Sequence, residues 1–476
     1  MVGVSFYTLW LLLSLIAVVH LLIYKREPSS TIAWLFFVTV VPIFGALLFL
    51  IFGPQRLERG ASKRRKEIEK LVRAPTAILP LAVSGEVDIN AGLPAEDTAV
   101  LRLARQVSDY GVTTGNGVEL LSDPHHALLA MQSAIEAAEH FIHLEYYIIS
   151  NDEVTAALFE YLVRAAERGV EVRVLYDAIG SLSLKRIYFR KLIQAGAKIA
   201  GFLPFSLIPQ RINFNFRNHR KILIIDGHTA FTGGTNIGRQ YLGRRNKSQW
   251  HDYSVKITGP VCLQLQDVFA KDWHFTTQED LFQSSYYPQA RAAGDSITQV
   301  LESGPDTAFA TLHQALFLAI NSAQYEILLT TPYFIPDPAI MFALTVAALR
   351  GVRVRLVLPL KSDAPLVRYA SRSFYDGLLR AGVEIYEYQP RILHAKLMVL
   401  DQKWTMLGSA NMDIRSFRLN FELNLLIYGN SVASQATQLF QMDLAQSQAV
   451  DPEKFRRRPI GLQMLENACR LLSPVL

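Results

Sequence analysis

A histidine and a lysine two residues apart occur twice in this sequence, and each pair is followed by an aspartate at the same distance. Residues 219–226 read HRKILIID and residues 394–401 read HAKLMVLD, so both segments follow the pattern H-x-K-x4-D. The agreement extends downstream, because a glycine lies fourteen residues and an asparagine seventeen residues after each histidine. Two copies with the same internal spacing predict a duplicated site.

The residue types in these segments are suited to binding an anion and moving a proton. Lysine supplies positive charge, the asparagine amide supplies hydrogen-bond donors, and histidine can act as a nucleophile or as an acid and base. A lysine ammonium repels a cation, so each pair makes a poor metal site. Two ordinary strands that end in polar residues would explain one copy, but the matched glycines and asparagines favour a site.

The apolar run after each lysine, Ile222–Ile225 and Leu397–Leu400, predicts a buried strand. Side chains alternate between the faces of a strand, so the histidine and lysine of each pair should point the same way. Asp226 and Asp401 lie five residues after their lysines, and this odd spacing places them on the opposite face. Because Gly227 marks a turn, we expect the aspartates to be turn or framework residues.

Together these motifs resemble those of the phospholipase D superfamily. The segments RNHRKILIIDG, GGTNIG, HAKLMVLD and GSANMDIRSFRLNFELN resemble more narrowly bacterial cardiolipin synthases, as do the apolar N-terminal segments and the C-terminal RLLSPVL. The resemblance covers essentially the whole chain. It implies two tandem α/β halves whose sheets pack together around a pseudo-twofold axis, so that both motifs meet in one cleft. The catalytic residues would be His219, Lys221, Asp226, His394, Lys396 and Asp401.

The resemblance also implies a mechanism that uses neither a metal nor a cofactor. One motif histidine would attack phosphorus and form a phosphohistidine, and the other would protonate the leaving oxygen. We assign His219 as the nucleophile and His394 as the acid and base, while the near-equivalence of the halves leaves the reverse assignment open. The strands turn back through TAFTGGTN and TMLGSAN. These segments should supply the residues that bind the phosphate oxygens, which are Asn236, Asn411 and Ser409.

Two carboxylates further along the chain could orient the histidine rings by accepting a proton from a ring nitrogen. Asp252 lies 33 residues after His219, and Glu422 lies 28 residues after His394. The superfamily uses a carboxylate in this way, so the match rests on context and not on spacing. His251 is excluded from the site, because adjacent residues on a strand face opposite ways.

The similarity between the halves extends well beyond the motifs. Residues 140–152 (HFIHLEYYIISND) resemble residues 325–337 (YEILLTTPYFIPD), although Glu145 of the first segment aligns with Thr330 of the second. AAERGVEVRVLYD and AALRGVRVRLVLP follow, and then LIQAGAKIAGFLP and LLRAGVEIYEYQP. Strands alternating with helices predict an α/β half with a mostly parallel sheet, made twice. We place the halves at 108–290 and 291–476.

The N-terminal residues 1–55 contain two apolar segments, 4–24 and 32–52, without any Asp, Glu, Lys or Arg. Each would span about 30 Å as a helix, which is the thickness of the bilayer hydrocarbon. With the polar turn Lys25–Ser30 between them, they predict a transmembrane helical hairpin. A signal peptide with one anchor and a pair of buried core helices are the alternatives. Residues 56–107 read as a basic linker and a lead-in helix.

Charge indicates the side of the membrane. The net charge of +6 suits anionic lipid or nucleic acid. Six basic residues between Arg56 and Lys66 favour a cytoplasmic catalytic region, so we expect a multi-pass protein of the bacterial inner membrane. The two cysteines, Cys262 and Cys469, cannot build a disulfide framework or a cysteine-rich zinc site.

A membrane hairpin favours a lipid substrate over nucleic acid. The cardiolipin synthases that this chain resembles join two phosphatidylglycerol molecules and release glycerol. The resemblance therefore implies phosphatidylglycerol as donor and acceptor, and the bilayer as partner. A phospholipase D that hydrolyses phospholipid, a transphosphatidylase for another headgroup and a membrane-tethered nuclease are the alternatives.

Overall fold

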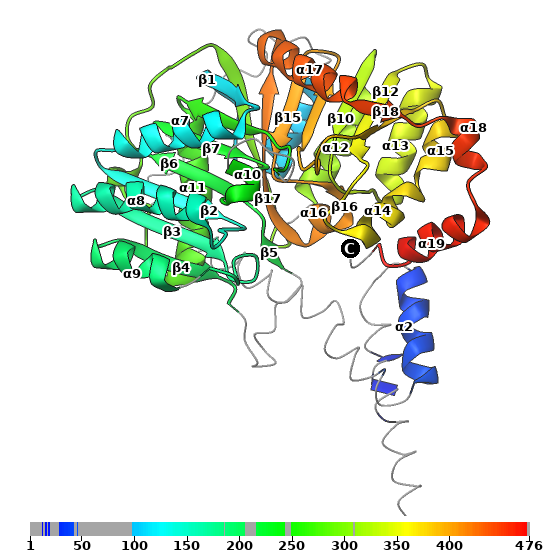
Figure 1. Cartoon of the computed structure of the whole chain (residues 1–476), viewed down its shortest axis with the longest axis horizontal. Helices are drawn as coiled ribbons and strands as arrows, with labels where there is room; N and C mark the ends of the chain where they lie inside the picture. Colours follow the sequence, from blue (N-terminus) through cyan, green and yellow to red (C-terminus); the bar gives the residue numbers. More distant parts are fainter. Residues whose placement is uncertain are drawn as a thin grey trace, which may run out of the picture. The chain divides into compact units, whose positions relative to one another are not determined.

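The chain folds into two compact units, one built mainly from the N-terminal segment and one from the globular remainder (Figure 1). Each unit is described by itself. The computed structural model describes residues 98–184, 186–204, 216–242, 249–307 and 310–473 of the globular unit, and residues 28–41 with a few positions nearby in the N-terminal unit.

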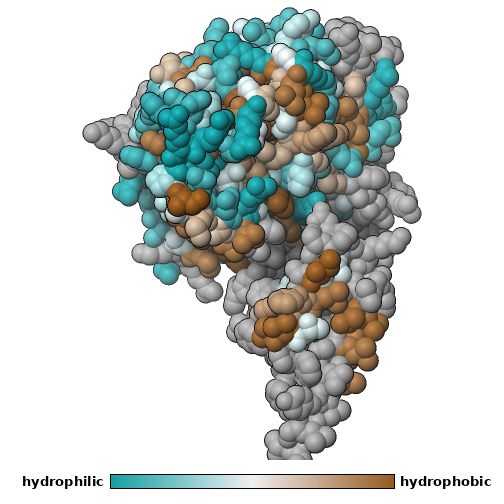
Figure 2. All heavy atoms as spheres, turned by 90° about the vertical axis from the view of Figure 1, so that its right-hand side faces the viewer, coloured by the Kyte–Doolittle hydropathy of each residue, from teal (hydrophilic) through white to brown (hydrophobic). Residues whose placement is uncertain are grey.

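In the N-terminal unit, helix α2 (Pro28–Val40) begins four residues before the predicted second span. Its first turn is the Pro-Ser-Ser that the sequence predicted as a turn, because proline is well tolerated at the start of a helix. Ile32, Phe36 and Val40 are exposed, and the described side chains of this segment are mostly hydrophobic (Figure 2). Within the described residues, no helix is both long and apolar enough to cross a bilayer. Most of segment 4–24 and most of residues 42–52 lie outside the described residues.

The first half of the globular unit follows the predicted lead-in helix, α6 (Thr98–Val107). Strands and helices alternate at its start, and a series of strands then leads to a long final helix. Its elements are β1 (Thr113–Leu121), α7 (Pro124–Glu136), β2 (Phe141–Tyr146), α8 (Glu153–Glu167), β3 (Glu171–Asp177), α9 (Arg186–Gln194), β4 (Lys198–Phe202), β5 (Arg217–Asn218), β6 (Lys221–Ile225), β7 (Thr229–Gly233), α10 (Arg239–Leu242), β8 (Ser254–Thr258) and α11 (Val261–Thr277).

The second half follows a short 3-10 turn, η2 (Ser284–Tyr286), and largely repeats this order, with the short strands β11 and β16 added, two helices in place of α9 and no counterpart of β5. It adds a strand and two helices at its C-terminal end. Its elements are β9 (Ser296–Ser303), α12 (Thr311–Ser322), β10 (Glu326–Thr330), β11 (Phe334–Ile335), α13 (Pro338–Leu349), β12 (Arg353–Pro359), α14 (Pro365–Arg372), α15 (Tyr375–Arg380), β13 (Glu384–Tyr388), β14 (Leu397–Leu400), β15 (Trp404–Gly408), β16 (Met412–Asp413), α16 (Ile414–Arg418), β17 (Asn420–Tyr428), α17 (Asn430–Ala445), β18 (Ser447–Ala449), α18 (Pro452–Arg456) and α19 (Ile460–Arg470).

One mixed sheet runs through both halves, in the order β18-β13-β12-β10-β14-β15-β17-β9-β1-β8-β7-β6-β2-β3-β4 (Figure 1). Only β2-β3-β4 and β10-β12-β13 are parallel, and the other neighbours in this order are antiparallel. The prediction of a mostly parallel sheet is therefore wrong. Each motif strand returns at once as a hairpin, and a hairpin forces antiparallel pairing. The halves also do not pack as two separate sheets, because β1 and β9 join them edge to edge.

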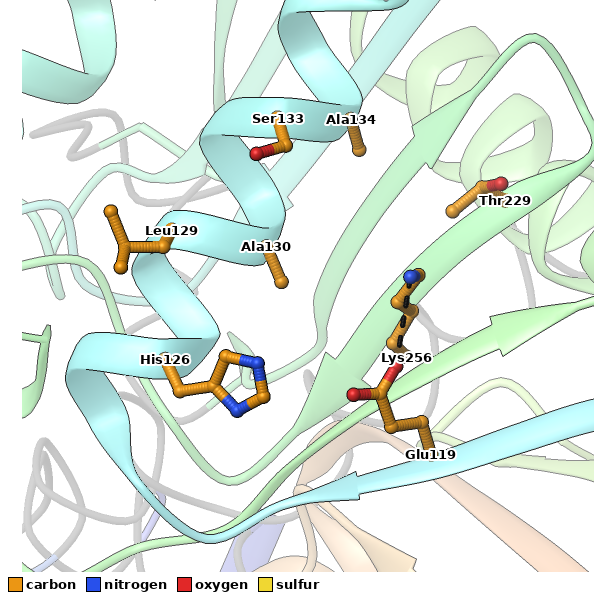
Figure 3. Close-up of a pocket in the computed structure, with 8 residues that line it drawn as sticks. All are labelled: Glu119, His126, Leu129, Ala130, Ser133, Ala134, Thr229 and Lys256. Atoms are coloured by element: carbon orange, nitrogen blue, oxygen red, sulfur yellow. Dashed lines mark ion pairs between the residues drawn. The ribbon is translucent and has the colours of Figure 1, made fainter.

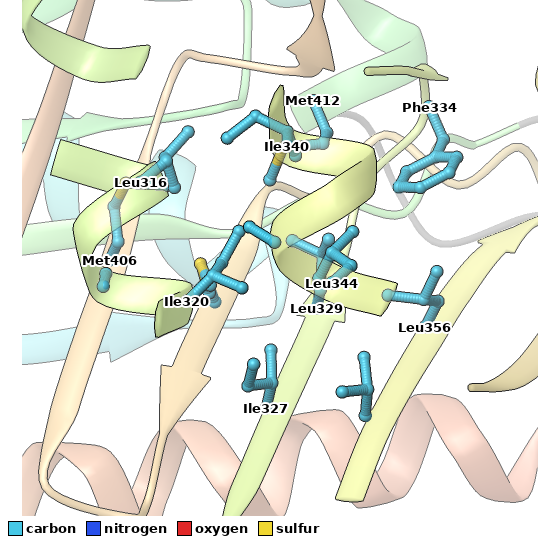
Figure 4. Close-up of a cluster of buried hydrophobic side chains, with 14 of the residues drawn as sticks. Leu316, Ile320, Ile327, Leu329, Phe334, Ile340, Leu344, Leu356, Met406 and Met412 are labelled. Carbon is cyan, nitrogen blue, oxygen red and sulfur yellow. The ribbon is translucent and has the colours of Figure 1, made fainter. Parts of the chain in front are cut away.

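Helices cover both faces of this sheet. Along β2, Ile142 and Leu144 belong to the core under α7 and α8, whereas the His143 ring stacks on Phe269 of α11 at 4.5 Å between centroids. In the second half, side chains of α12, α13, β10 and β12 form the corresponding core (Figure 4), and α17 packs on the sheet strands as α11 does. Full burial of such an aliphatic side chain contributes about 1.5–3 kcal/mol. The duplication predicted from the sequence is thus visible in the layers.

Two aspartates tie the end of each motif strand to the start of the neighbouring strand. Asp226 follows β6 with φ of 52°, and Asp401 follows β14 with φ of 50°. Each carboxylate accepts three backbone N–H groups at 2.7–2.8 Å, which belong to Glu139, His140 and Phe141 in the first half and to Gln324, Tyr325 and Glu326 in the second. Both are therefore turn residues that fix strand positions, as the odd spacing predicts.

Replacing Asp401 by alanine should lower the free energy of unfolding by about 2–4 kcal/mol, because three N–H groups lose a charged acceptor and water replaces it only in part. Thermal or urea unfolding of the full chain measures this loss. As a control, Asp376→Ala breaks an exposed pair with Arg380 and should change stability by less than about 0.5 kcal/mol. Unchanged stability in Asp401→Ala would contradict the framework role.

Candidate active site

Backbone hydrogen bonds bring each motif into contact with the other half of the chain. The N–H of His219 donates to the carbonyl of Phe421 at 2.9 Å, and the N–H of His394 donates to the carbonyl of His251 at 2.7 Å. The residues just before each histidine also pair with the other half. The short strand β5 runs parallel to β17, and Leu393 forms a bridge with His251. Each motif therefore lies beside the segment of the other half that carries a predicted orienting carboxylate.

Each motif histidine bonds the carboxylate that belongs to the other half. His219 Nδ1 lies 2.9 Å from Glu422 Oε2, and His394 Nδ1 lies 2.5 Å from Asp252 Oδ2. These four side chains are buried. The sequence identifies both carboxylates, but their order along the chain suggests pairing within each half, and the structure exchanges them. If each neutral ring donates its Nδ1–H to the carboxylate, Nε2 remains as its basic atom.

Burial and charge set the protonation of these pairs. Burial is the main cause that lowers the pKa of His219 to about 4, and burial with the charge of Lys396 lowers that of His394 to about 4. Burial alone would raise the pKa of Glu422, but its contacts with His219 and Lys221 bring that pKa down to about 2. Lys396 and His394 likewise hold the pKa of Asp252 below its usual value, against the effect of burial. Both pairs are therefore a neutral imidazole and a carboxylate at neutral pH.

The two motif lysines are buried beside the histidines. Lys221 Nζ donates to the carbonyl of His219 at 2.6 Å, and Lys396 Nζ donates to the carbonyl of His394. Lys396 Nζ also lies 3.8 Å from Asp252 Oδ2. Burial is the main cause that lowers the pKa of Lys221 to about 7; the charge of Lys396 acts in the same direction, and the attraction of Glu422 acts against both. Burial also lowers the pKa of Lys396. An anion between the lysines would stabilise both ammonium groups.

The two asparagines are buried and retain unused hydrogen-bonding capacity. Asn236 Oδ1 accepts the N–H of Ile148 at 3.2 Å, and its Nδ2 makes no hydrogen bond within the described part of the chain. Asn411 donates its backbone N–H to Ser416 Oγ at 3.1 Å, and its Oδ1 has no partner among the described residues. The free Nδ2 donor of Asn236 is suited to holding a phosphate oxygen, whereas the free Oδ1 of Asn411 is an acceptor.

Ser409, which was predicted to bind phosphate, has its hydroxyl beside Glu422 in the structure. Its hydroxyl is fully buried, donates to Glu422 Oε2 at 2.5 Å and accepts the N–H of Leu423 at 2.9 Å. It therefore supports the carboxylate partner of His219. The first half has Gly234 at the equivalent position, where a Cβ would lie 2.3 Å from Asp252 Oδ1. The glutamate therefore lies beside a serine, and the shorter aspartate lies beside a glycine.

Aromatic rings that the sequence reasoning missed surround both histidines. The Tyr147 ring lies 4.8 Å from that of His219, and the rings of Trp250 and Tyr241 lie 5.2 and 5.4 Å from that of His394. Such rings pack against the histidines and exclude water from them. Trp250 and Tyr241 belong to the segment after Asn236 that differs between the halves, so the internal repeat gives no signal for them.

A buried arginine next to the first histidine was also missed. Arg220 donates to Asp272 Oδ2 at 2.7 Å, to Glu302 Oε2 at 3.2 Å and to the carbonyl of Glu422 at 3.4 Å. It therefore links α11 of the first half to β9 and β17 of the second. Removing one partner of a buried ion pair typically costs about 3–5 kcal/mol. Arg220 lies between His219 and Lys221 in the sequence, and this position within the motif could have identified it as part of the site.

The side chains of His251 and Glu145 contact residues other than the motif histidines and lysines. His251 Nε2 is 2.6 Å from Asp443 Oδ1. Glu145 is buried, where its Oε1 accepts from Asn218 Nδ2 at 2.5 Å. Among the described residues, no group of three or more His, Cys, Asp or Glu side chains is placed to hold a metal ion.

A separate surface groove lies between α7 and strands β1, β7 and β8 (Figure 3). Lys256 Nζ lies 3.6 Å from Glu119 Oε2 in this groove, and Thr229 lines it from the start of β7. The site residues follow the other end of that strand, after Gly233. The groove therefore contains none of the predicted site residues.

Comparisons with known proteins agree with this arrangement. A family model described as "Cardiolipin synthase, PLD-like domain" matches residues 131–273 and 316–444, and one described as "Phospholipase_D-nuclease N-terminal" matches residues 12–54. The cardiolipin synthases of Geobacillus kaustophilus and Geobacillus thermodenitrificans are each 37% identical to this chain, over 95% of this chain and 90% of theirs. The crystal structure of the phosphatidylserine synthase of Haemophilus influenzae shares the fold, with a TM-score of 0.62, 16% identity, and coverage of 79% of this chain and 100% of that one.

Replacing Gly234 by alanine should reduce phosphodiester turnover by about 10²-fold, because the new Cβ would displace the Asp252 carboxylate from His394. Initial rates measure the effect. Gly377→Ala in α15 is the matched control, since a Cβ there meets nothing within 4 Å, and it should turn over as the unmodified protein does. A normal rate in Gly234→Ala would show that this histidine–carboxylate contact is dispensable.

Binding of a phosphodiester anion at pH 7.5 should be accompanied by proton uptake. The pKa of Lys221 is about 7 in the free site, so this lysine is largely neutral at pH 7.5, and a bound anion favours its charged form. Calorimetric titration with dimethyl phosphate in buffers of different ionisation enthalpy measures the uptake. Lys221→Arg should take up fewer protons, because arginine is already charged. Equal heats in all buffers for the unmodified protein would contradict this account.

Proposed function

The chain belongs to the cardiolipin synthase family of phospholipase D-like proteins, and on this premise we propose that it is a membrane-bound cardiolipin synthase. In the proposed reaction, a phosphatidyl group passes from one phosphatidylglycerol to another and glycerol is released. The observation that carries the proposal is the pair of crossed histidine–carboxylate contacts, each with a buried lysine beside it. Such a site suits a phosphodiester that changes one alcohol for another.

In the first step, His219 Nε2 attacks phosphorus, the bond to the glycerol oxygen breaks and a phosphohistidine forms. The imidazole becomes a cation as it reacts, and Glu422 stabilises that charge through Nδ1–H. Two donors support this assignment of the nucleophile, because Ser409 Oγ and Asn420 Nδ2 hold Glu422 at 2.5 and 3.1 Å. The carboxylate is therefore fixed before charge develops on the ring.

The non-bridging oxygens gain negative charge as the nucleophile approaches. Lys221 and Lys396 supply positive charge close to both histidines, and Asn236 and Asn411 supply amide groups. Donors that are fixed in advance contribute roughly 3–4 kcal/mol each in comparable sites. The anionic substrate also favours protonation of His394, which needs a proton to act as an acid.

His394 would then transfer a proton to the leaving alcohol and take one from the incoming alcohol. It protonates the glycerol oxygen as it leaves, and its neutral ring next removes the proton from the hydroxyl of the second phosphatidylglycerol. That oxygen attacks phosphorus, the bond from phosphorus to His219 breaks and cardiolipin forms. Asp252 holds His394 through Nδ1 during both transfers. Each step exchanges one alcohol at phosphorus, so the reaction should be reversible.

The N-terminal segment is proposed to hold the enzyme in the membrane. The apolar residues 4–24 and 32–52 would form a transmembrane hairpin, and the match of a family model to residues 12–54 supports a common N-terminal element. The basic residues from Arg56 to Lys66 support a cytoplasmic position for the catalytic region of this inner-membrane protein. The bilayer then supplies both substrates.

Purified full-length protein in phosphatidylglycerol vesicles should form cardiolipin and glycerol in equal amounts, detected by mass spectrometry and a glycerol assay. Added glycerol should suppress net synthesis and return cardiolipin to phosphatidylglycerol. His219→Ala and His394→Ala should each lower the rate by roughly 10³-fold or more. His125→Ala, at an exposed histidine of α7, is the matched control and should be fully active.

Two outcomes would contradict the proposal. Phosphatidic acid as the main product, without any effect of glycerol, would identify a hydrolase. A His219→Ala or His394→Ala variant that retains near-normal synthesis would show that the two motifs do not act in one site.

A further inference from the structure

The site lies at one edge of the sheet, and the segments that follow β3 and β12 border it. Tyr146 at the end of β2 pairs with Lys221, and the adjacent strand β3 ends at Asp177, whose Oδ2 accepts the N–H of Asn218 at 2.9 Å. Residues 178–184 therefore begin next to His219. In the second half, Tyr333 donates to Asp363 at 2.8 Å, just before α14.

Apolar side chains are exposed along this border. Leu182 follows β3 and is 73% exposed, and Ile187 in the first turn of α9 is 60% exposed. Leu366 in the first turn of α14 is 51% exposed. Scattered exposed leucines are ordinary, but these positions lie on equivalent segments of the two halves at the same edge. In Figure 1, α9, α14 and α19 lie along the same side of the globular unit.

Helix α19 extends this apolar surface from α14. It packs on α14 through its inner face, where Glu466 is buried and accepts from Arg372 Nε at 3.0 Å. Its outer face carries Ile460 and Met464, and Leu471 follows as the C-cap residue; these side chains are 71%, 66% and 82% exposed. These residues lie four and seven positions apart, so they share one side of the helix. Asn467 lies between Met464 and Leu471 on this side, and an exposed face with several large apolar residues marks an interaction surface.

The surroundings of α19 are positively charged. Lys454, Arg456, Arg457 and Arg470 are exposed near this helix and outnumber the exposed Asp451 and Glu453. Glu453 pairs with Arg457 at 3.4 Å, whereas Glu466 is buried between arginines. Basic residues beside an exposed apolar helix face favour the surface of an anionic bilayer. A partner protein with an acidic and apolar surface could bind anywhere on the molecule. A bilayer that supplies the substrate must contact the surface beside the site, where this face lies.

We propose that the outer face of α19, with Leu182, Ile187 and Leu366, rests on the surface of the anionic bilayer and places the site at the level of the lipid headgroups. This contact is additional to the N-terminal segment. It rests on the proposed function, because the substrates reside in that bilayer. Phosphatidylglycerol would then reach the histidines without leaving the membrane.

The test uses full-length protein with a thiol at one exposed position. Cys262 and Cys469 are buried, so Met464→Cys can be labelled with an environment-sensitive fluorophore. Leu349→Cys is the matched control, because this leucine is 70% exposed at the end of α13, on the opposite edge of the sheet. In phosphatidylglycerol vesicles, the emission at 464 should shift to the blue and be quenched by brominated lipid, and that at 349 should not.

A second measurement separates docking from chemistry. Met464→Glu combined with Leu471→Glu should lower synthesis in phosphatidylglycerol vesicles by about fivefold or more, yet leave turnover of detergent-dispersed phosphatidylglycerol within about twofold. Loss of both activities, with loss of folding by circular dichroism excluded, would instead implicate the catalytic site. Absence of cardiolipin formation by the unmodified protein in either medium would refute the proposed function and leave the fluorescence test intact.

Two results would overturn the docking proposal. An aqueous emission at 464 in phosphatidylglycerol vesicles would show that α19 does not touch the bilayer. Burial of the label in dilute detergent, together with crosslinks between copies through the thiol introduced by Met464→Cys, would show that a second copy of this chain covers the face.

Discussion

The structure depends on an exchange of carboxylates between its halves. His219 bonds Glu422 and His394 bonds Asp252, so neither half contains a complete histidine–carboxylate pair. The backbone enforces the exchange, because each histidine N–H also bonds the residue before its carboxylate partner. The edge pairing of β1 with β9 and the short pairing of β5 with β17 keep these contacts in register. One continuous sheet is the consequence, since a hinge between the halves would break both pairs.

The electrostatics of the site follow from the same burial. Two lysines and two histidines lie next to two carboxylates without solvent around them, and desolvation favours the neutral form of each base. A bound phosphodiester would bring a negative charge into this site, and that charge would favour the protonated form of Lys221. Arg220 supports this arrangement from behind, because it keeps a permanent charge paired with Asp272 and Glu302 and holds the Glu422 carbonyl.

Much of the site could be predicted, because its residues repeat at fixed spacing within short segments. The motif residues and both asparagines lie close together along the chain, so local sequence identifies them, whereas the two carboxylates lie at different distances from their motifs and were predicted from the family resemblance. The crossed pairing could not be predicted, because it depends on the register between β17 and β5, which are about two hundred residues apart along the chain. The sheet was predicted mostly parallel because helix–strand alternation dominates the first part of each half, while the hairpins of β6 and β14 decide the rest. The contact between Ser409 and Glu422 could not be predicted, because GSAN gives no sign of a carboxylate thirteen residues away.

The different small residues beside the two carboxylates have an evolutionary consequence. In one half, Ser409 supports a glutamate, and in the other, Gly234 leaves room for an aspartate. A single exchange at either position creates a clash or an unsupported carboxylate, so divergence between the repeats must proceed by compensated pairs of substitutions. Each further pair makes the repeats less interchangeable. Each small residue lies in the same repeat as the carboxylate that it contacts, so a compensated pair can arise in one repeat without a change in the other.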